Sequence, residues 1–359
     1  MSTLLTGSET EGTRVVVALD IGGTTLVSGL VTADGTVLHS AARPAVRDGR
    51  RDPDLVGTVA VAREMTEAAA AIRAEVVGIG AGFPEFVDAT GTLTSHEVLD
   101  RAVQPADLLH PLVPGRPVVV ESDVRCGALA EARFGRGRGL GSFLYVSLGT
   151  GLSAAFAQGG RVWEGHRGEA VALGNWEVPA SVDPEFSAAV RDGRTPNLEE
   201  YVSGAGIAAR YAAATGADVT EARQVVLRAA AGDGAAAALL TTAGRALGAA
   251  LGWAVSMLDP EAIVIGGGLG TAGGLLHEAA WDTYAERSPR PGRPPMRYAE
   301  LGERSGLLGA ALGVWDHPAV DGGARRASSS RPLGPVPCAV TVRAAPDAGT
   351  VRATSATTW

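Results

Sequence analysis

The sequence predicts an α/β protein of two domains, built on a strand-and-turn unit that occurs twice. In the first unit an apolar strand over residues 15–20 runs into Gly22-Gly23-Thr24-Thr25. In the second unit a strand over residues 143–148 runs into Gly149-Thr150-Gly151. Two similar units so far apart in one chain indicate an internal duplication, with a ligand held between the halves.

The first half of the chain is expected to contain five strands and one helix. An Asp34-Gly35 pair is a strong signal for a tight turn between two of these strands. The run of alanines before residue 74 is typical of a helix. The expected strands cover 15–20, 26–32, 37–42, 76–81 and 118–121, and the expected helix covers 55–74.

The second half is expected to be mainly helical. Its longest predicted helix ends at Asp259-Pro260, because proline cannot continue a helix. Gly135 is expected to end an earlier helix that follows Asp123. The expected helices cover 127–134, 221–231, 235–258 and 306–315, and one more buried strand covers 262–265.

Composition excludes several classes of protein. The formal net charge is −8 and no run of basic residues occurs, which argues against nucleic-acid or membrane-surface binding. Every basic side chain is arginine, so lysine-nucleophile chemistry is excluded. The two cysteines, Cys126 and Cys338, allow no disulfide framework. With no apolar signal core and no long uncharged apolar run, we expect a cytoplasmic protein.

The glycine-rich turns are typical of phosphate binding. Glycine leaves room for a phosphate to approach the backbone, and threonine hydroxyls can hold its oxygens. Asp20, at the end of the first strand, can hold Mg²⁺ through water. A third glycine segment after the strand over 262–265 could let a nucleoside lie flat. The expected nucleotide-binding residues are Asp20, Gly22, Gly23, Thr24, Thr25, Gly149, Thr150, Gly151, Gly266, Gly267 and Gly268.

At this point the chain resembles the ROK family (repressor, open reading frame, kinase) over residues 14–315. The resemblance depends on seven pieces that occur in the family's order rather than on one motif. They are residues 20–25, 80–88, 121–135, 148–151, 198–204, 265–270 and 306–311.

The resemblance implies an actin-like ATPase fold, a duplicated ribonuclease H-like α/β architecture with two domains around a nucleotide cleft. It implies ATP and Mg²⁺ as cofactors, a sugar or sugar-like substrate, and a homodimer. The last helix would cross back onto the first domain. The expected organisation is a flexible N-terminus over 1–13, a first domain over 14–121 plus 306–316, a second domain over 122–305, and a disordered tail over 317–359.

Asp123 matches the catalytic acid of the family. A carboxylate there can accept the proton of a sugar hydroxyl as the terminal phosphoryl group of ATP arrives. The alternative is that Asp123 only caps the helix after it. A Pro84-Glu85 pair stands where the family usually has Pro-Gly, which brings a carboxylate near the expected sugar pocket or leaves it as an exposed loop acid. The expected substrate-binding residues are Gly82, Pro84, Glu85, Ser122, Asp123, Asn175 and Glu199.

The chain departs from the family where the sugar is recognised. Family kinases carry Glu-x-Gly-His beside the anomeric end of the hexose, and the matching stretch here begins at Ala172 and ends at Asn175. The cysteines that bind a structural zinc with that histidine are also missing from residues 190–197. We therefore expect no zinc site. These losses favour a C7-cyclitol kinase of secondary metabolism, such as antibiotic biosynthesis, over a plain glucokinase.

Other interpretations remain open. The protein could be a conventional glucokinase or N-acylhexosamine kinase, or a sugar sensor of the same family without turnover. DNA binding is disfavoured, because only about fourteen polar residues precede the first strand and a helix-turn-helix needs more. The roles of several polar and aromatic residues near the expected pocket also stay open. These are His96, Glu97, Arg125, Trp163, His166 and Trp176.

Overall fold

The computed structural model describes residues 12–47, 50–99, 101–189 and 195–321. The expectations for a flexible N-terminus and a disordered tail concern residues 1–11 and 322–359, which lie outside this range. Residues that we expected at the start of the tail form the short helix α11 (Pro318–Asp321).

The first five-stranded sheet has the order β3-β2-β1-β6-β7. Neighbouring strands β1, β2 and β3 are antiparallel, whereas β1, β6 and β7 are parallel. The strands are β1 (Arg14–Ile21), β2 (Thr25–Val31), β3 (Val37–Pro44), β6 (Glu75–Phe83) and β7 (Val118–Ser122). All five strands expected from the sequence are present.

The second sheet repeats this topology with the order β10-β9-β8-β11-β12. Again the first three strands along the chain are antiparallel and the later two join in parallel. The strands are β8 (Ser142–Leu148), β9 (Leu152–Gln158), β10 (Arg161–Val162), β11 (Ala262–Gly266) and β12 (Met296–Tyr298). The shared topology confirms the predicted duplication.

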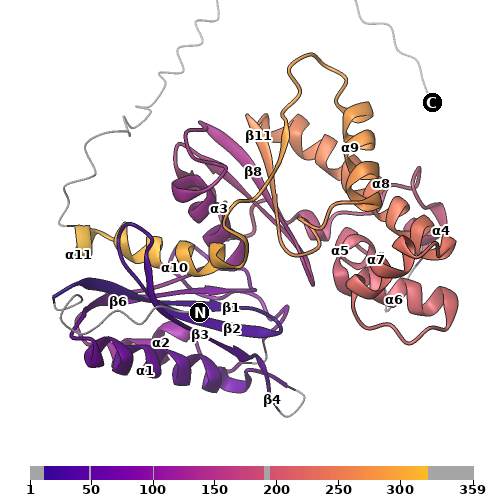
Figure 1. The fold of residues 1–359 in the computed structure, drawn as a ribbon. Helices are drawn as coiled ribbons and strands as arrows, with labels where there is room; N and C mark the ends of the chain where they lie inside the picture. The colour runs from indigo at the N-terminus through magenta and orange to yellow at the C-terminus, as the bar shows by residue number, and fades with distance from the viewer. Residues whose placement is uncertain (1–11, 48–49, 100, 190–194, 322–359) are drawn as a thin grey trace, which may run out of the picture. The chain divides into compact units, whose positions relative to one another are not determined.

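Helices cover both faces of the first sheet. Helix α1 (Val56–Ala71) packs on one face, against residues such as Val17 and Ile79. Helix α10 (Ser305–Trp315) packs on the other, against Val16 and Ala18 (Figure 1). Because side chains alternate along a strand, neighbouring residues of β1 belong to two different cores.

Helix α3 (Asp123–Phe134) contacts both α10 and the second sheet. Its Cys126 carbonyl lies so close to Gly309 of α10 that a Cβ at Gly309 would overlap it. The fully buried Glu131 of α3 accepts hydrogen bonds from the backbone N–H groups of Glu300 and Leu301, at 2.9 Å each. These contacts hold α3 against α10 and against the segment that leads into it.

The other face of the second sheet is covered by the remaining large helices. Parallel helices α8 (Gly234–Leu258) and α9 (Leu275–Arg287) pack closely, because Gly244 and Gly248 lie directly against the backbone carbonyls of Leu276 and Ala280. By length and composition α8 could cross a membrane, but 56% of its apolar window is buried in the protein, as in the core helix of a globular domain.

The remaining elements are short or connect the two sheets. The helices are α2 (Pro105–Leu109), α4 (Pro184–Ala188), α5 (Leu198–Val202), α6 (Gly204–Thr215) and α7 (Ala222–Ala230). The 3₁₀ turns are η1 (Pro53–Leu55), η2 (His110–Leu112), η3 (Leu173–Asn175) and η4 (Gly302–Arg304), and strands β4 (Val46–Arg47) and β5 (Arg50–Arg51) form a small separate sheet. Most helices agree with the predicted ranges to within a few residues.

One predicted boundary was wrong. The helix expected from Gly127 begins at Asp123 instead, with Ser122 as its N-cap residue. A carboxylate in the first turn is favourable at the positive end of a helix, so Asp123 itself favours the earlier start. The change places Asp123 on the helix rather than in the loop before it.

Candidate active site

The first glycine turn joins β1 to β2. Its backbone is closed by a hydrogen bond from the Gly22 N–H to the Thr25 carbonyl, at 2.9 Å. Thr24 and Thr25 are exposed, so their hydroxyl groups are available to a ligand. Gly23 lies beside Val98. The Val98 Cγ1 is 3.6 Å from the position that a Cβ on Gly23 would take.

Asp20 lies just before this turn with its carboxylate against the backbone of Gly306. Burial raises the pKa of Asp20 to about 6. Among the described residues no hydrogen bond to this carboxylate offsets the burial. A partly buried carboxylate without a donor is suited to a cation, directly or through its water ligands.

The second glycine turn joins β8 to β9 and repeats the design. The Gly149 N–H donates to the Gly151 carbonyl at 3.0 Å. The start of α6 is fixed on this turn, because the Gly204 N–H donates to the Gly149 carbonyl at 2.8 Å and the Ala205 N–H to the Thr150 carbonyl at 3.1 Å. A cavity of about 490 Å³ opens here between Thr150 and the first turns of α6.

The third glycine segment lies beside the second turn. Gly267 has a φ of +83° and touches the carbonyl of Leu148, the last residue of β8, so a side chain there would be strained and would clash. The Gly270 N–H donates to the same carbonyl at 2.8 Å. Gly268 is exposed and faces open space. The structure thus brings the expected Gly149–Gly151 and Gly266–Gly268 segments to one edge of the second sheet.

Asp123 directly follows β7, next to the end of β6. Phe83 pairs with Ser122 in parallel register, and Gly82 lies close enough that its missing Cβ would sit 3.5 Å from the Asp123 Cα. The Asp123 Oδ1 accepts from the Val124 N–H at 2.6 Å. Because this is the adjacent amide, the side chain does not form the N2 or N3 bond of an ordinary helix cap.

The electrostatics of Asp123 are those of a partly buried carboxyl group among other acids. Burial is the main cause that raises its pKa to about 7, and the negative charge of Asp20 adds to the rise. The Val124 N–H opposes it, and the charges of Glu85 and Glu199 contribute further increases. A carboxyl group with this pKa can both accept and release a proton near neutral pH.

Glu199 is held beside the segment in which family residues are replaced. Its Oε2 accepts from the Leu152 N–H at 2.7 Å, and it lies 2.8 Å from the position of a Cβ on Gly151. Gly174 borders the same carboxylate. Asn175, which ends η3, is exposed. The substitution at Asn175 therefore lies one residue from the Glu199 contact.

Glu85 is not the exposed loop acid that one interpretation expected. It is 4% exposed, and its carboxylate accepts hydrogen bonds from residues 95–99. His96 and Glu97, in the same segment, are exposed. No side-chain pattern marks this arrangement in the sequence, because most of the partners are backbone N–H groups.

Arg125 is buried and pairs with an acid. Its guanidinium is 2.6 Å from the Glu121 carboxylate and also donates to the Val87 carbonyl. Trp163 and His166 are exposed, and the ring of Trp176 lies 6.4 Å from that of Trp253. Among the described residues, the side chains of Trp163, His166 and Trp176 form no hydrogen bond, ion pair or ring contact with Asp123.

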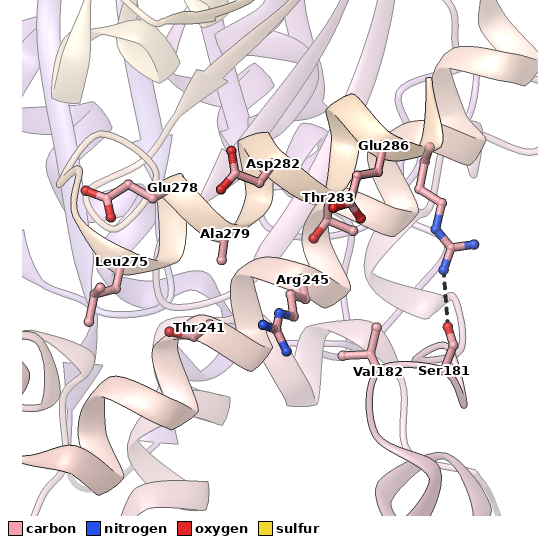
Figure 2. Close-up of a pocket in the computed structure, with 11 residues that line it drawn as sticks. Ser181, Val182, Thr241, Arg245, Leu275, Glu278, Ala279, Asp282, Thr283 and Glu286 are labelled. Atoms are coloured by element: carbon pink, nitrogen blue, oxygen red, sulfur yellow. Dashed lines mark hydrogen bonds between the residues drawn. The ribbon is translucent and has the colours of Figure 1, made fainter. Parts of the chain in front are cut away.

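A second cavity, of about 480 Å³, lies along α8 and α9 (Figure 2). Thr241 and Arg245 of α8 line it together with acidic residues of α9, and Arg287 donates to the Ser181 Oγ at 3.2 Å. None of the site residues predicted from the sequence lines this cavity. It is therefore separate from the cluster around Asp20 and Asp123.

Comparison with known proteins gives consistent matches over most of the chain. The profile described as "ROK family" matches residues 16–316. The glucokinase of Streptomyces coelicolor is 28% identical over 321 residues, which cover 83% of this chain and 96% of the relative. An N-acetylgalactosamine kinase from a Shewanella species is 32% identical over 240 residues, covering 65% of this chain and 77% of the relative.

A solved structure of similar fold contains bound ligands. It is the crystal structure of a ROK family glucokinase from Streptomyces griseus in complex with glucose and AMPPNP. The two proteins superpose with a TM-score of 0.70 at 27% identity, over 84% of this chain and 100% of that one.

Proposed function

Because the chain belongs to the ROK family, we propose that it transfers the terminal phosphoryl group of ATP to a hydroxyl group of a sugar or sugar-like ring. It is a phosphotransferase with an alcohol acceptor and has the actin-like ATPase fold of its relatives. The observation that carries the proposal is the position of Asp123, a carboxyl group with a pKa of about 7 at the ends of two adjacent parallel strands.

Asp123 acts as the general base in this proposal. The acceptor hydroxyl gives its proton to the Asp123 carboxylate while its oxygen forms a bond to the γ-phosphorus. The bond between that phosphorus and the bridging oxygen breaks, and ADP leaves with the electron pair. A base with a pKa near the working pH is partly ionised and still strong enough to accept the proton.

Asp20 and the glycine turns serve the nucleotide. The Asp20 carboxylate fits Mg²⁺, because it is partly buried and has no hydrogen-bond donor among the described residues, beside a turn whose threonines are exposed. Mg²⁺ would supply positive charge that offsets the charge on the phosphates. The turns at Gly22–Thr25 and Gly149–Gly151 would hold the phosphates, and the open space at Gly268 supports a nucleoside site there.

The acceptor proposed first is a C7 cyclitol, phosphorylated on its primary hydroxyl. The support is the replacement of the family's glutamate and histidine by Ala172 and Asn175. Hydroxyl groups at the anomeric end of glucose lose two polar partners, at a cost of about 1–3 kcal/mol each. A ring with carbon in place of the hemiacetal oxygen, or with different substituents there, is affected less.

A conventional hexose kinase is the second candidate. The similar proteins favour a hexose kinase, because two of them are a glucokinase and an N-acetylgalactosamine kinase. The retained Glu199 is also compatible with a hexose. A cytoplasmic location, a homodimer and the lack of nucleic-acid binding remain predictions.

A screen of pooled acceptors tests both candidates. The protein is incubated with Mg²⁺–ATP and a mixture of glucose, mannose, N-acetylmannosamine, N-acetylgalactosamine and valiolone, and the phosphorylated products are identified by mass spectrometry. We expect a phosphorylated cyclitol as the main product. A hexose phosphate as the main product would select the second candidate, and no phosphorylated product would exclude both and favour the sugar sensor.

A further inference from the structure

The buried carboxylate of Glu85 gathers a segment of backbone around itself. It accepts from the N–H groups of Glu97 at 2.8 Å, Val98 at 2.9 Å and Leu99 at 2.7 Å, and also from the Ser95 hydroxyl. Four donors satisfy both oxygens of the buried charge. The carboxylate at position 85 therefore stabilises this conformation of residues 95–99.

Two further side chains bond to the start of the segment and to the chain just before it. The buried Arg101 donates to the carbonyls of Ser95 at 2.8 Å and Leu93 at 3.1 Å. The side-chain amide of Gln104 accepts from the Leu93 N–H and donates to the Leu93 carbonyl. Because these groups bond to backbone rather than to other side chains, they set the path of the chain without using the exposed side chains of residues 96 and 97.

The fixed segment reaches the site around Asp123. Val98 packs beside Gly23 of the first glycine turn. Glu85 follows β6 by two residues, and Asp123 follows β7 by one, and these strands are paired up to Phe83 and Ser122. Glu85 is close enough to Asp123 for its charge to act on that carboxyl group. Residues 95–99 thus border the turn proposed for phosphates, and they hold the carboxylate whose charge acts on the proposed base.

We propose that Glu85 is a positioning residue for the phosphoryl acceptor: it holds residues 95–99 as one wall of the acceptor site, where His96 and Glu97 select the acceptor. This inference rests on the proposed function. The family resemblance has glycine in this position, which cannot bind the segment in the same way. The anchoring of this segment by a carboxylate is therefore a departure of this chain from the family pattern, in addition to the changes at Ala172 and Asn175.

The test combines hydrogen exchange with steady-state kinetics on the full chain. In Glu85→Gln an amide NH₂ must face backbone N–H donors, so the peptide covering 95–99 should exchange about tenfold faster or more. The KM for the best acceptor should rise about tenfold or more, while the KM for Mg²⁺–ATP stays within about twofold. Ser95→Ala removes a single donor and gives a milder variant, expected to change both quantities in the same direction if Glu85→Gln folds poorly.

Asp88→Asn is the matched control. Its carboxylate also binds backbone N–H groups in this loop, at Thr90 and Thr92, but none in residues 95–99. We expect exchange at 95–99 and the acceptor KM to stay near the wild-type values. A purely structural role for Glu85 would lower the amount of active protein without separating the two KM values.

Binding is read separately from transfer. Valiolone or glucose is added without ATP, and slower exchange at 95–99 reports contact with the segment. Faster exchange in Glu85→Gln with an unchanged acceptor KM would overturn the inference, as would unchanged exchange. If the wild type phosphorylates no acceptor of the pooled screen but valiolone or glucose protects 95–99, the proposed function fails and the role of Glu85 stands. If no acceptor is phosphorylated and neither compound protects the segment, both fail.

Discussion

The carboxylate of Asp20 lies against the backbone of Gly306, at the start of the helix that closes the first sheet. The two residues are at opposite ends of the described chain, and a Cβ on residue 306 would overlap all three atoms of the carboxylate group. Asp20, which we propose to hold Mg²⁺, is thus positioned by helix α10, which lies near the other end of the described chain.

Gly306→Ala should therefore damage nucleotide use. The added methyl group forces Asp20 out of its position, and we expect kcat/KM for Mg²⁺–ATP to fall about tenfold or more. Gly234→Ala is the control, because Gly234 begins α8 and nothing lies within 4 Å of its missing Cβ. Steady-state kinetics at varied Mg²⁺–ATP make the comparison, and a wild-type value for Gly306→Ala would contradict the proposed role of Asp20.

Asp123→Asn should abolish most of the turnover without abolishing nucleotide binding. Asparagine keeps the shape but cannot accept the proton, so kcat should fall by about 10²-fold or more. ATP affinity, measured by calorimetry, should change little. Near-normal turnover would show that another group takes the proton.

The same variant should make the protein more stable at alkaline pH. The pKa of Asp123 is about 7 in the folded protein, against about 3.9 for an unperturbed aspartate. A raised pKa favours the protonated folded form, so its contribution to stability is present below pH 4 and is lost as the pH rises through 7. Without Mg²⁺ or ATP, Asp123→Asn should melt at a higher temperature than the wild type at pH 8, by roughly 2–5 °C, and at about the same temperature at pH 4.

Asp88 provides a control of the opposite sign. Hydrogen bonds, first of all from the Thr90 hydroxyl, hold the pKa of Asp88 below its usual value. Its contribution to stability is therefore present above the unfolded pKa and is lost as the pH falls. Asp88→Asn should lower the melting temperature at pH 8, and equal shifts in both variants would refute the electrostatic explanation.

Restoring the family pair should restore the family preference. In Ala172→Glu combined with Asn175→His, the ratio of kcat/KM for glucose to that for valiolone should rise about tenfold or more. Glu199 lies beside this segment through Gly151 and Gly174, so Glu199→Gln should impair both acceptors alike. A wild type that strongly prefers glucose, with no response in the double variant, would refute the recognition argument.

The protein should fold without zinc. Among the described residues no group of histidine, cysteine or acidic side chains could hold a metal ion through three or more ligands, while residues 190–194 of the expected loop lie outside that range. Elemental analysis should find no stoichiometric zinc, and a strong chelator should leave the melting temperature unchanged at constant Mg²⁺. Tightly held zinc would show that the loop had been misinterpreted.

The sheets and the glycine turns could be predicted because their signals are local. An apolar run followed by glycine marks the end of β1, β8 and β11 alike, and the matching sheet orders follow from the duplication. The environment of Glu85 could not be predicted in this way. Three of its four partners are backbone N–H groups twelve to fourteen residues away, and every residue except proline carries such a group.

The same limit applies to longer-range contacts. Glu131 bonds to the N–H groups of Glu300 and Leu301, 169 and 170 residues away, and no side-chain pattern marks either partner. The start of α3 was missed for a different reason. Gly127 looked like a helix boundary, but it is buried in the helix against Tyr145, where a Cβ would lie 2.8 Å from the ring.

Helix α10 covers one face of the first sheet. The sheet therefore cannot finish folding when its own strands have been synthesised, because α10 has not yet left the ribosome. At ordinary synthesis rates, on the order of 10 s or more separates the emergence of β7 from that of α10. During this interval Val16, Ala18 and Val77, all fully buried in the finished protein, lack their covering helix. A chain truncated before residue 305 would be left permanently in this state and should aggregate, and the nascent protein is a natural client for chaperones throughout the synthesis of its second half.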